Sequence, residues 1–194
     1  MSTLIPSQRH GAIAKNVAVL GFGTALAQFL NIIITPVLSW YYSPEAFGVM
    51  AASLSIVYIV ASLSNANYDA AIVMPKEKEE SADLLVLCLM MNVAVTVLFF
   101  GVAWFVTSFL ERFAPYSSLW LLTMLAVGVL LMSSFNCLQV YAVRVEDYAA
   151  SSASHVMRTL SCIIVQLVGV LFTSSAYWLI AGRVFGLAPA IAYL

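Results

Sequence analysis

Charged side chains are scarce in this sequence of 194 residues: nine are acidic, eight are basic, and together they make up 9% of the chain. A soluble domain usually carries about 25% charged residues, so these few cannot cover a water-facing surface. Hydrophobic residues account for 63% of the chain, and the mean hydropathy is +0.99. The scarcity of charge therefore excludes an ordinary soluble domain and indicates a chain whose main solvent is lipid.

Signatures of catalysis, metal binding and nucleotide binding are also missing from the sequence. No GxSxG, HExxH, P-loop or dinucleotide-binding motif occurs. Cys88, Cys137 and Cys162 stand singly in apolar runs without CxxC spacing, so we expect small buried hydrophobic residues. His10 and His155 are far apart, and we expect both at the surface or at helix ends. We therefore predict no enzyme, no cofactor and no metal, and the net charge of −1 gives no basic field for nucleic acid.

Long apolar runs fill the chain instead. Because lipid cannot hydrogen-bond to the backbone, only helices or a closed barrel can cross a membrane. The runs are about 20 residues long, as a helix requires, and not the roughly ten of a barrel strand. We predict an all-α, polytopic transmembrane bundle of about six helices, forming a single domain over residues 1–194. The fifth span is the shortest, and we expect the Ala149–His155 stretch to extend it upstream. The predicted spans are Asn16–Trp40, Phe47–Asn65, Ala82–Phe109, Leu119–Val143, Met157–Phe172 and Tyr177–Leu194.

Basic residues predict the orientation of the bundle, since they are retained in cytoplasmic loops. With the N-terminus inside, six of the eight bases fall in cytoplasmic segments, and Arg112 alone falls outside. The eighth base, Arg183, lies within the sixth span. We therefore predict that both chain ends are cytoplasmic, N-in and C-in. The six bases counted as cytoplasmic are Arg9, Lys15, Lys76, Lys78, Arg144 and Arg158.

Polar residues recur on one face of several predicted helices. In the first helix, four polar residues from Thr24 to Thr35 follow one another at spacings of four, three and four, which places them on one stripe. The second, fourth and fifth helices carry similar stripes. Two interpretations stay open: hydrogen bonds that hold helices together, or a shared hydrated cavity along a substrate pathway. The candidate pathway residues are Gln28, Asn31, Asn65, Asp69, Asn136, Gln139, Gln166 and Arg183.

Arg183 is the only charged residue well inside a predicted span. A guanidinium there costs roughly 3 kcal/mol on insertion scales unless it snorkels or faces a cavity. It either snorkels to the interface or contacts an anionic substrate such as a lipid-linked diphosphate sugar. Gly182 and Gly186 form a GxxxG pattern around it, which favours close approach of another helix. Asp69, near the predicted cytoplasmic mouth, either anchors a helix end or takes part in a proton relay.

Two short motifs carry a resemblance to a known family. A basic N-terminus and a glycine-rich first helix lead into the turn YSPEAFG at Tyr42–Gly48, and YDAAIVMPK follows the second helix at Tyr68–Lys76. This arrangement resembles the polysaccharide (O-antigen and exopolysaccharide) flippases of the multidrug/oligosaccharidyl-lipid/polysaccharide transporter superfamily. Those proteins often show a Tyr-acid-x-Ala-Ile-x-x-Pro-Lys run after the second helix, and Asp69 stands where they usually have glutamate.

The resemblance implies a flippase of lipid-linked polysaccharide precursors in the bacterial inner membrane. Its substrate would be a polyprenyl-diphosphate-linked glycan, moved by alternating access between two six-helix bundles. The present chain would correspond to the N-terminal bundle. It would then pair with a second six-helix bundle, which is either a copy of itself or a separate C-terminal half.

Two alternatives to the flippase stay open. A drug/cation antiporter of the multidrug and toxin extrusion type would need a cation-coordinating acid within the bundle. We expect no acid deeper in the membrane than Asp69. An inactive truncated remnant or a non-transporting membrane scaffold would need no functional site at all.

Overall fold

The computed structural model describes residues 6–65, 78–110 and 119–194. In these ranges the chain is helical and contains no strand, and six stretches are long and apolar enough to cross a membrane. The all-α bundle is therefore confirmed, and the chain is a multi-pass membrane protein. The helices are α1 (Pro6–Tyr41), α2 (Pro44–Asn65), α4 (Lys78–Leu110), α5 (Leu119–Arg144), α6 (Tyr148–Phe172), α7 (Ala176–Phe185) and α8 (Leu187–Tyr193).

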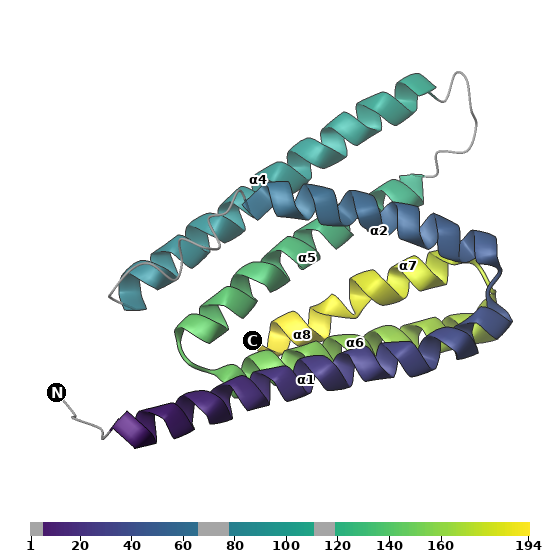
Figure 1. Ribbon diagram of the computed structural model, residues 1–194. Coiled ribbons are helices and arrows are strands. Elements are labelled where there is room, and N and C mark those ends of the chain that lie inside the picture. The colour runs from purple at the N-terminus through teal and green to yellow at the C-terminus, as the bar shows by residue number, and fades with distance from the viewer. Residues whose placement is uncertain (1–5, 66–77, 111–118) are drawn as a thin grey trace.

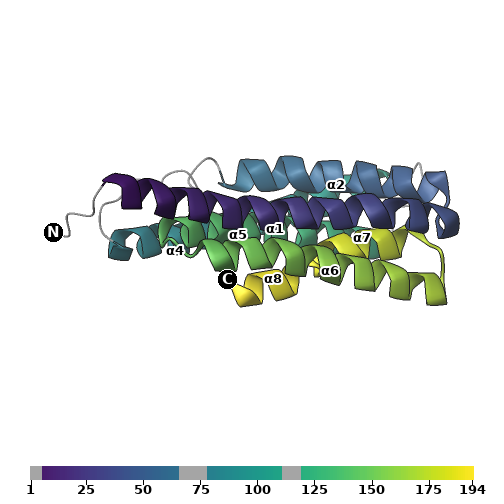
Figure 2. The ribbon, with the colours of Figure 1, turned by 60° about the horizontal axis from the view of Figure 1, so that its bottom comes forward.

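Helix α6 begins earlier than the predicted span. Asp147 caps its first turn by accepting a hydrogen bond from the backbone N–H of Ala150 at 2.9 Å, and the expected upstream extension is part of the helix. Arg158 consequently lies in the middle of the Tyr148–Phe172 span, so its assignment to a cytoplasmic segment was wrong. Five bases remain in the predicted cytoplasmic segments, against Arg112 alone in the predicted outside loops, so the predicted orientation is unchanged. The orientation stays a prediction, although α1 begins and α8 ends toward the same end of the bundle (Figures 1 and 2).

Helices α7 and α8 lie between α6 on one side and α5 on the other (Figure 1). Helix α1 lies along α6, which also packs against α7 and α8, while α2 packs against α5 and α7, and α4 against α5. The turn at residues 42–43 joins α1 to α2, and the two helices then diverge toward the opposite end (Figure 1). Of the described helices, α1 and α2 make few contacts with each other although they are neighbours in sequence.

Small polar side chains lie between the helices beside buried apolar clusters, while many large apolar side chains face outward. Phe22, Trp40 and Leu171 are 71%, 85% and 83% exposed, which suits side chains that face lipid. Helices in lipid gain little from burying more hydrocarbon, so they associate through close packing and hydrogen bonds between small residues. Buried hydroxyl residues accordingly line the helix interfaces: Ser53, Ser64, Ser81, Thr96, Ser133, Ser151, Ser152, Ser154 and Thr159. The three cysteines are buried, as expected.

The sixth predicted span is broken into two helices. Pro189 has no backbone N–H to donate to the carbonyl of Phe185, and its ring crowds that position. Helix α7 therefore ends at Phe185, Gly186 donates back to the carbonyl of Gly182 at 3.0 Å, and α8 starts at Leu187. The break places Arg183 in the last turn of α7, near the middle of the span.

Candidate functional site

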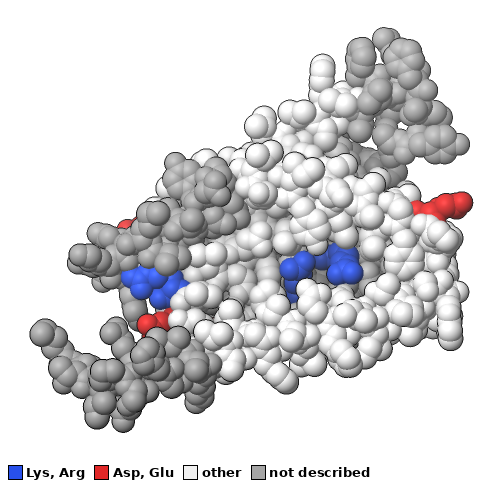
Figure 3. All heavy atoms as spheres, in the orientation of Figure 1, with Lys and Arg blue, Asp and Glu red and all other residues white. Residues whose placement is uncertain are grey.

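A polar cavity of about 350 Å³ lies in the middle of the bundle, where α1 and α2 diverge. Helices α1, α2, α6 and α7 contribute its walls. In the space-filling view, Lys and Arg atoms lie in a hollow at the centre of the face between α1 and α2, with no Asp or Glu atoms beside them (Figure 3). The described residues that line the cavity are Thr24, Ala27, Gln28, Asn31, Tyr58, His155, Arg158, Thr159, Cys162 and Arg183.

Two arginines define the charge of this cavity. Arg158 and Arg183 both line it, and the described part of its lining contains no acidic residue. Among the described residues, neither guanidinium has a carboxylate partner, and the buried Nε of Arg183 has no hydrogen-bond acceptor. An unpaired charge at this depth costs roughly 3 kcal/mol on insertion scales. The cavity is therefore strongly cationic and able to accept an anion.

Close packing of α6 on α7 brings the two arginines to the same cavity. A Cβ on Gly182 would lie 3.0 Å from the carbonyl oxygen of Cys162, and one on Gly186 would lie 2.9 Å from that of Arg158. Because neither glycine has a side chain, the backbones of α6 and α7 touch here. The expected close approach at the GxxxG pattern is confirmed, and α6 is the partner helix.

Arg158 rests on an aromatic ring from a third helix. Its Cζ lies 5.3 Å from the ring centroid of Phe135 on α5, within the range of a cation–π contact. His155 packs edge-on against the same ring, with the centroids 5.7 Å apart. His155 is half-buried inside α6 and lines the cavity, so its expected place at the surface or a helix end was wrong.

The first helix supplies an uncharged polar wall. The Asn31 amide donates to the carbonyl of Ala27 at 3.0 Å and the Thr24 hydroxyl to that of Leu20 at 3.0 Å. Gln28 is exposed, and its side chain forms no hydrogen bond to another described residue. Gln28 and Asn31 are thus the two predicted pathway residues that share the cavity with Arg183.

Gln139 and Gln166 lie at helix interfaces away from the cavity. The Gln139 amide donates to the hydroxyl of Ser154 at 2.6 Å, which ties α5 to α6. The Gln166 amide donates to the carbonyl of Leu179 at 3.1 Å, which ties α6 to α7. These contacts correspond to the interhelical interpretation, and a pathway role for either residue stays a prediction.

Of the remaining predicted pathway residues, only Asn136 has a described side chain. Asn136 is half-buried on α5 and is not part of the cavity lining. Asn65 is the last residue of α2, and Asp69 lies outside the described residues. Tyr58 lines the cavity and belongs to the polar stripe of the second helix, but it was not among the candidate pathway residues, and no pattern in the sequence indicated Asn92. Asn92, fully buried on α4, accepts hydrogen bonds from the hydroxyls of Ser64 and Ser133.

Comparison with known proteins identifies a family but no individual relative. No curated protein and no solved structure matches the chain. A family model described as "Polysaccharide biosynthesis protein" matches residues 37–193. The matched range contains both arginines, Phe135 and His155, while most of α1 precedes it. Since the match covers more than half of the sequence and includes five of the six spans in full, the chain belongs to the polysaccharide biosynthesis protein family.

Proposed function

We propose that this bundle helps to translocate a lipid-linked oligosaccharide or polysaccharide precursor across the bacterial inner membrane, without chemistry on the substrate. In this proposal both chain ends are cytoplasmic, and the diphosphate of a polyprenyl-diphosphate-linked glycan contacts Arg158 and Arg183. A membrane protein of a polysaccharide biosynthesis family has to handle intermediates whose sugar is made on one side of the membrane and used on the other.

The observation that carries the proposal is the pair of arginines without a counter-ion. Guanidinium groups form bidentate hydrogen bonds with phosphate oxygens, and two of them offset the charge of a diphosphate group. In the described lining of the cavity no carboxylate competes for them. The cost of keeping two such charges within the membrane, roughly 3 kcal/mol each, has a physical explanation if an anion binds between them.

A second, largely apolar cavity matches the lipid part of such a substrate. It has a volume of about 580 Å³ and runs beside the first half of α1, lined by Val17, Leu20 and Gly21 among others. Thr24 and Gln28 line both cavities. An apolar groove that continues into a cationic cavity suits an amphiphile with an isoprenoid chain and a charged head.

The alternative transporter is disfavoured by the same charges. A drug/cation antiporter has to attract a cation, whereas both charged residues that line the described cavity are arginines. Asp69, which the sequence places near the predicted cytoplasmic mouth, lies outside the described residues. The remnant interpretation predicts no anion site, and the experiment below separates it from the flippase.

A second six-helix bundle is the proposed protein partner. The cationic cavity is bounded by α1, α2, α6 and α7, and it opens where α1 and α2 diverge. Alternating access needs two units that move around one site. A copy of this chain, or a separate C-terminal half, facing that opening would complete the enclosure.

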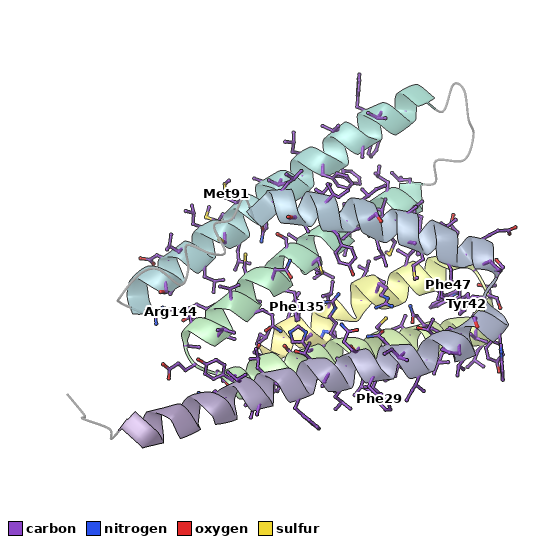
Figure 4. All side chains as sticks on the ribbon, in the orientation of Figure 1. Phe29, Tyr42, Phe47, Met91, Phe135 and Arg144 are labelled. Carbon is purple, nitrogen blue, oxygen red and sulfur yellow. The ribbon has the colours of Figure 1, made fainter. Side chains whose placement is uncertain are left out.

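The test is complementation of a bacterial strain that lacks its own lipid-linked-glycan flippase. Arg158→Gln and Arg183→Gln should each reduce surface polysaccharide at least tenfold and raise the amount of lipid-linked glycan at the inner leaflet. The corresponding Lys variants should retain part of the activity, because lysine keeps the charge but not the bidentate geometry. Arg144→Gln is the matched control, since Arg144 lies at the end of α5 outside the cavity (Figure 4).

The outcomes are distinct for the three candidate functions. Full activity in the double Gln variant would contradict an arginine-based flippase. Export of a cationic dye that depends on neither arginine would support the antiporter. No complementation by the wild-type chain, whether alone or with a companion bundle, would support the remnant.

A further inference from the structure

Arg158 has an unusual environment for a charge inside a membrane protein. A buried guanidinium is commonly stabilised by a carboxylate, but here the described neighbour beneath it is the ring of Phe135, 5.3 Å from ring centroid to Cζ. That ring is only 2% exposed and comes from α5, a different helix. Figure 4 shows Phe135 directed into the centre of the bundle.

An aromatic ring and a carboxylate stabilise a cation in different ways. The face of a ring attracts a cation through its quadrupole and carries no net charge. A carboxylate at the same position would cancel the charge of the guanidinium and would compete with any anionic ligand. A ring therefore holds Arg158 in place and leaves its full charge available to the cavity.

The surroundings of Phe135 fix the ring in the orientation that this role requires. The imidazole of His155 packs edge-on against it at an interplanar angle of 85°. Leu187 and Ala190 of α8 form a buried cluster with it, and Met132 packs against that cluster. With these contacts in place, the ring cannot rotate freely, and one face stays opposite Arg158.

We propose that Phe135 is a positioning residue: its ring holds the Arg158 guanidinium at the cavity without neutralising the positive charge, and so keeps that charge available to an anionic ligand. The inference rests on the proposed function for the identity of that anion, a diphosphate. It goes beyond it by assigning a role in ligand binding to a buried apolar residue that does not line the cavity.

The competing explanation is that Phe135 only fills the core, since it is part of the cluster with α8. A change of shape, such as Phe135→Leu, disturbs both roles at once. Replacement with mono-, di- and trifluorophenylalanine separates them. Fluorine withdraws electron density from the ring face and weakens the cation–π contact, while the ring keeps its shape and becomes no less apolar.

The first measurement is the dissociation constant of farnesyl diphosphate for the purified chain in detergent micelles. It should rise stepwise with each added fluorine, by about tenfold over the whole series, which corresponds to about 1.4 kcal/mol. The thermal midpoint should fall much less than in Phe135→Leu, because the shape and the apolar packing of the ring are retained. The control is the same series at Phe100, whose ring contacts Trp104 at 5.8 Å and has no arginine over its face among the residues that the structure describes. A dissociation constant that stays constant across the Phe135 series would overturn the inference.

The second measurement does not depend on ligand binding, so it separates this inference from the proposed function. The NMR signal of the Arg158 Nε–H group, assigned by its loss in Arg158→Lys, should carry a ring-current shift that decreases in Phe135→Leu. An unchanged signal in Phe135→Leu would refute the contact on which the positioning role depends, even if the chain binds farnesyl diphosphate. In the fluorinated series the ring keeps its shape, so a signal that broadens or moves stepwise with added fluorine would support the positioning role, whereas a signal that stays the same would leave Phe135 as a core residue only. Such a stepwise change in a chain that fails to bind farnesyl diphosphate would support the positioning role and contradict the proposed function.

Discussion

At the scale of single residues, the bundle depends on polar side chains that satisfy one another in the absence of water. Asn92 is 0% exposed. Its side-chain amide oxygen accepts hydrogen bonds from the hydroxyl of Ser64 on α2 at 2.8 Å and from that of Ser133 on α5 at 2.6 Å. One amide thus joins three helices. Hydrogen bonds between helices in membranes are worth about 0.6 kcal/mol on average and up to about 1.7 kcal/mol.

Asn92→Ala should therefore destabilise the protein without changing the charge of the cavity. We expect the free energy of unfolding to fall by about 1–2 kcal/mol, from two lost hydrogen bonds and a small void. Unfolding by steric trapping in micelles measures this change. Asn136→Ala is the matched control on α5, and it should cost less than about 0.5 kcal/mol. Equal losses in the two variants would contradict the assigned role of Asn92.

Sequence reasoning found part of the site, and the physical reasons for the rest are specific. Arg183 was predictable because one guanidinium interrupts a long apolar run. Arg158 and His155 were placed wrongly because the predicted span was started at Met157: the Ala- and Ser-rich stretch before it is only weakly apolar, and it was expected to extend the helix but was not counted as part of the membrane span. Contacts with α1 stabilise this weakly apolar stretch, since the Ser152 hydroxyl donates to the backbone carbonyl of Val19 at 2.9 Å. Asn92 has only Thr96 as a polar neighbour one turn away, so a search for stripes of three or more polar residues passes over this helix.

At the scale of helices, glycine determines where two elements touch. The face of α7 at Gly182 meets the backbone of α6 at Cys162, where a Cβ would lie only 3.0 Å from a carbonyl oxygen. Because Arg183 follows Gly182 directly, the spacing between α6 and α7 also determines where its guanidinium lies relative to Arg158.

Gly182→Ala should consequently force α6 and α7 apart. We expect a loss of about 1–3 kcal/mol in the free energy of unfolding, as for an overpacked core, together with weaker binding of farnesyl diphosphate. Gly101→Ala is the control, since a Cβ at Gly101 on α4 meets no atom within 4 Å. That change should leave stability the same or raise it by up to about 1 kcal/mol through helix propensity. Similar behaviour of the two variants would contradict the close contact.

The turn between α1 and α2 is held by a single buried hydroxyl. Tyr42 is 2% exposed and donates to the backbone carbonyl of Gln166 on α6 at 2.8 Å. Burial raises the pKa of Tyr42 above its ordinary value, so the phenol stays protonated and remains a donor at neutral pH. The contact fixes one end of α1 and α2, while their other ends diverge around the cavity.

Tyr42→Phe should lower the free energy of unfolding by about 0.5–1.5 kcal/mol, the usual net contribution of one hydrogen bond. The neighbouring change Tyr41→Phe should have almost no effect, because Tyr41 is 52% exposed. Thermal unfolding of the two variants in the same detergent makes the comparison. A larger loss in Tyr41→Phe than in Tyr42→Phe would show that the turn is held in another way.

At the scale of the whole molecule, the described helices present a lipid-facing apolar exterior and enclose buried apolar clusters, interhelical hydrogen bonds and a cationic cavity. The helical bundle could be predicted from the length and hydropathy of the apolar runs alone. The cavity could not, because it depends on the divergence of α1 from α2 and on the break before Pro189, which are results of packing. Adjacent residues of α1 report the two environments: Gln28 lines the cavity, and Phe29 lies on the outer side of the helix (Figure 4).

Water should therefore reach one side of α1 and not the other. Gln28→Cys should react quickly with a charged thiosulfonate reagent, because a thiolate forms only where water enters, whereas Phe29→Cys should react at least tenfold more slowly. Mass spectrometry of the modified peptides separates these positions from the native cysteines. Reagent applied to one face of the membrane at a time also tests the predicted orientation. Equal rates at positions 28 and 29 would contradict a hydrated cavity.

The most direct test of the central claim is equilibrium binding of farnesyl diphosphate to the wild-type chain and to the Arg158→Gln, Arg183→Gln double variant. If the two guanidinium groups form the anion site, affinity should fall at least a hundredfold in the double variant, and farnesol, which lacks the diphosphate, should bind weakly to both. Equal affinity of the two proteins for farnesyl diphosphate would contradict the account.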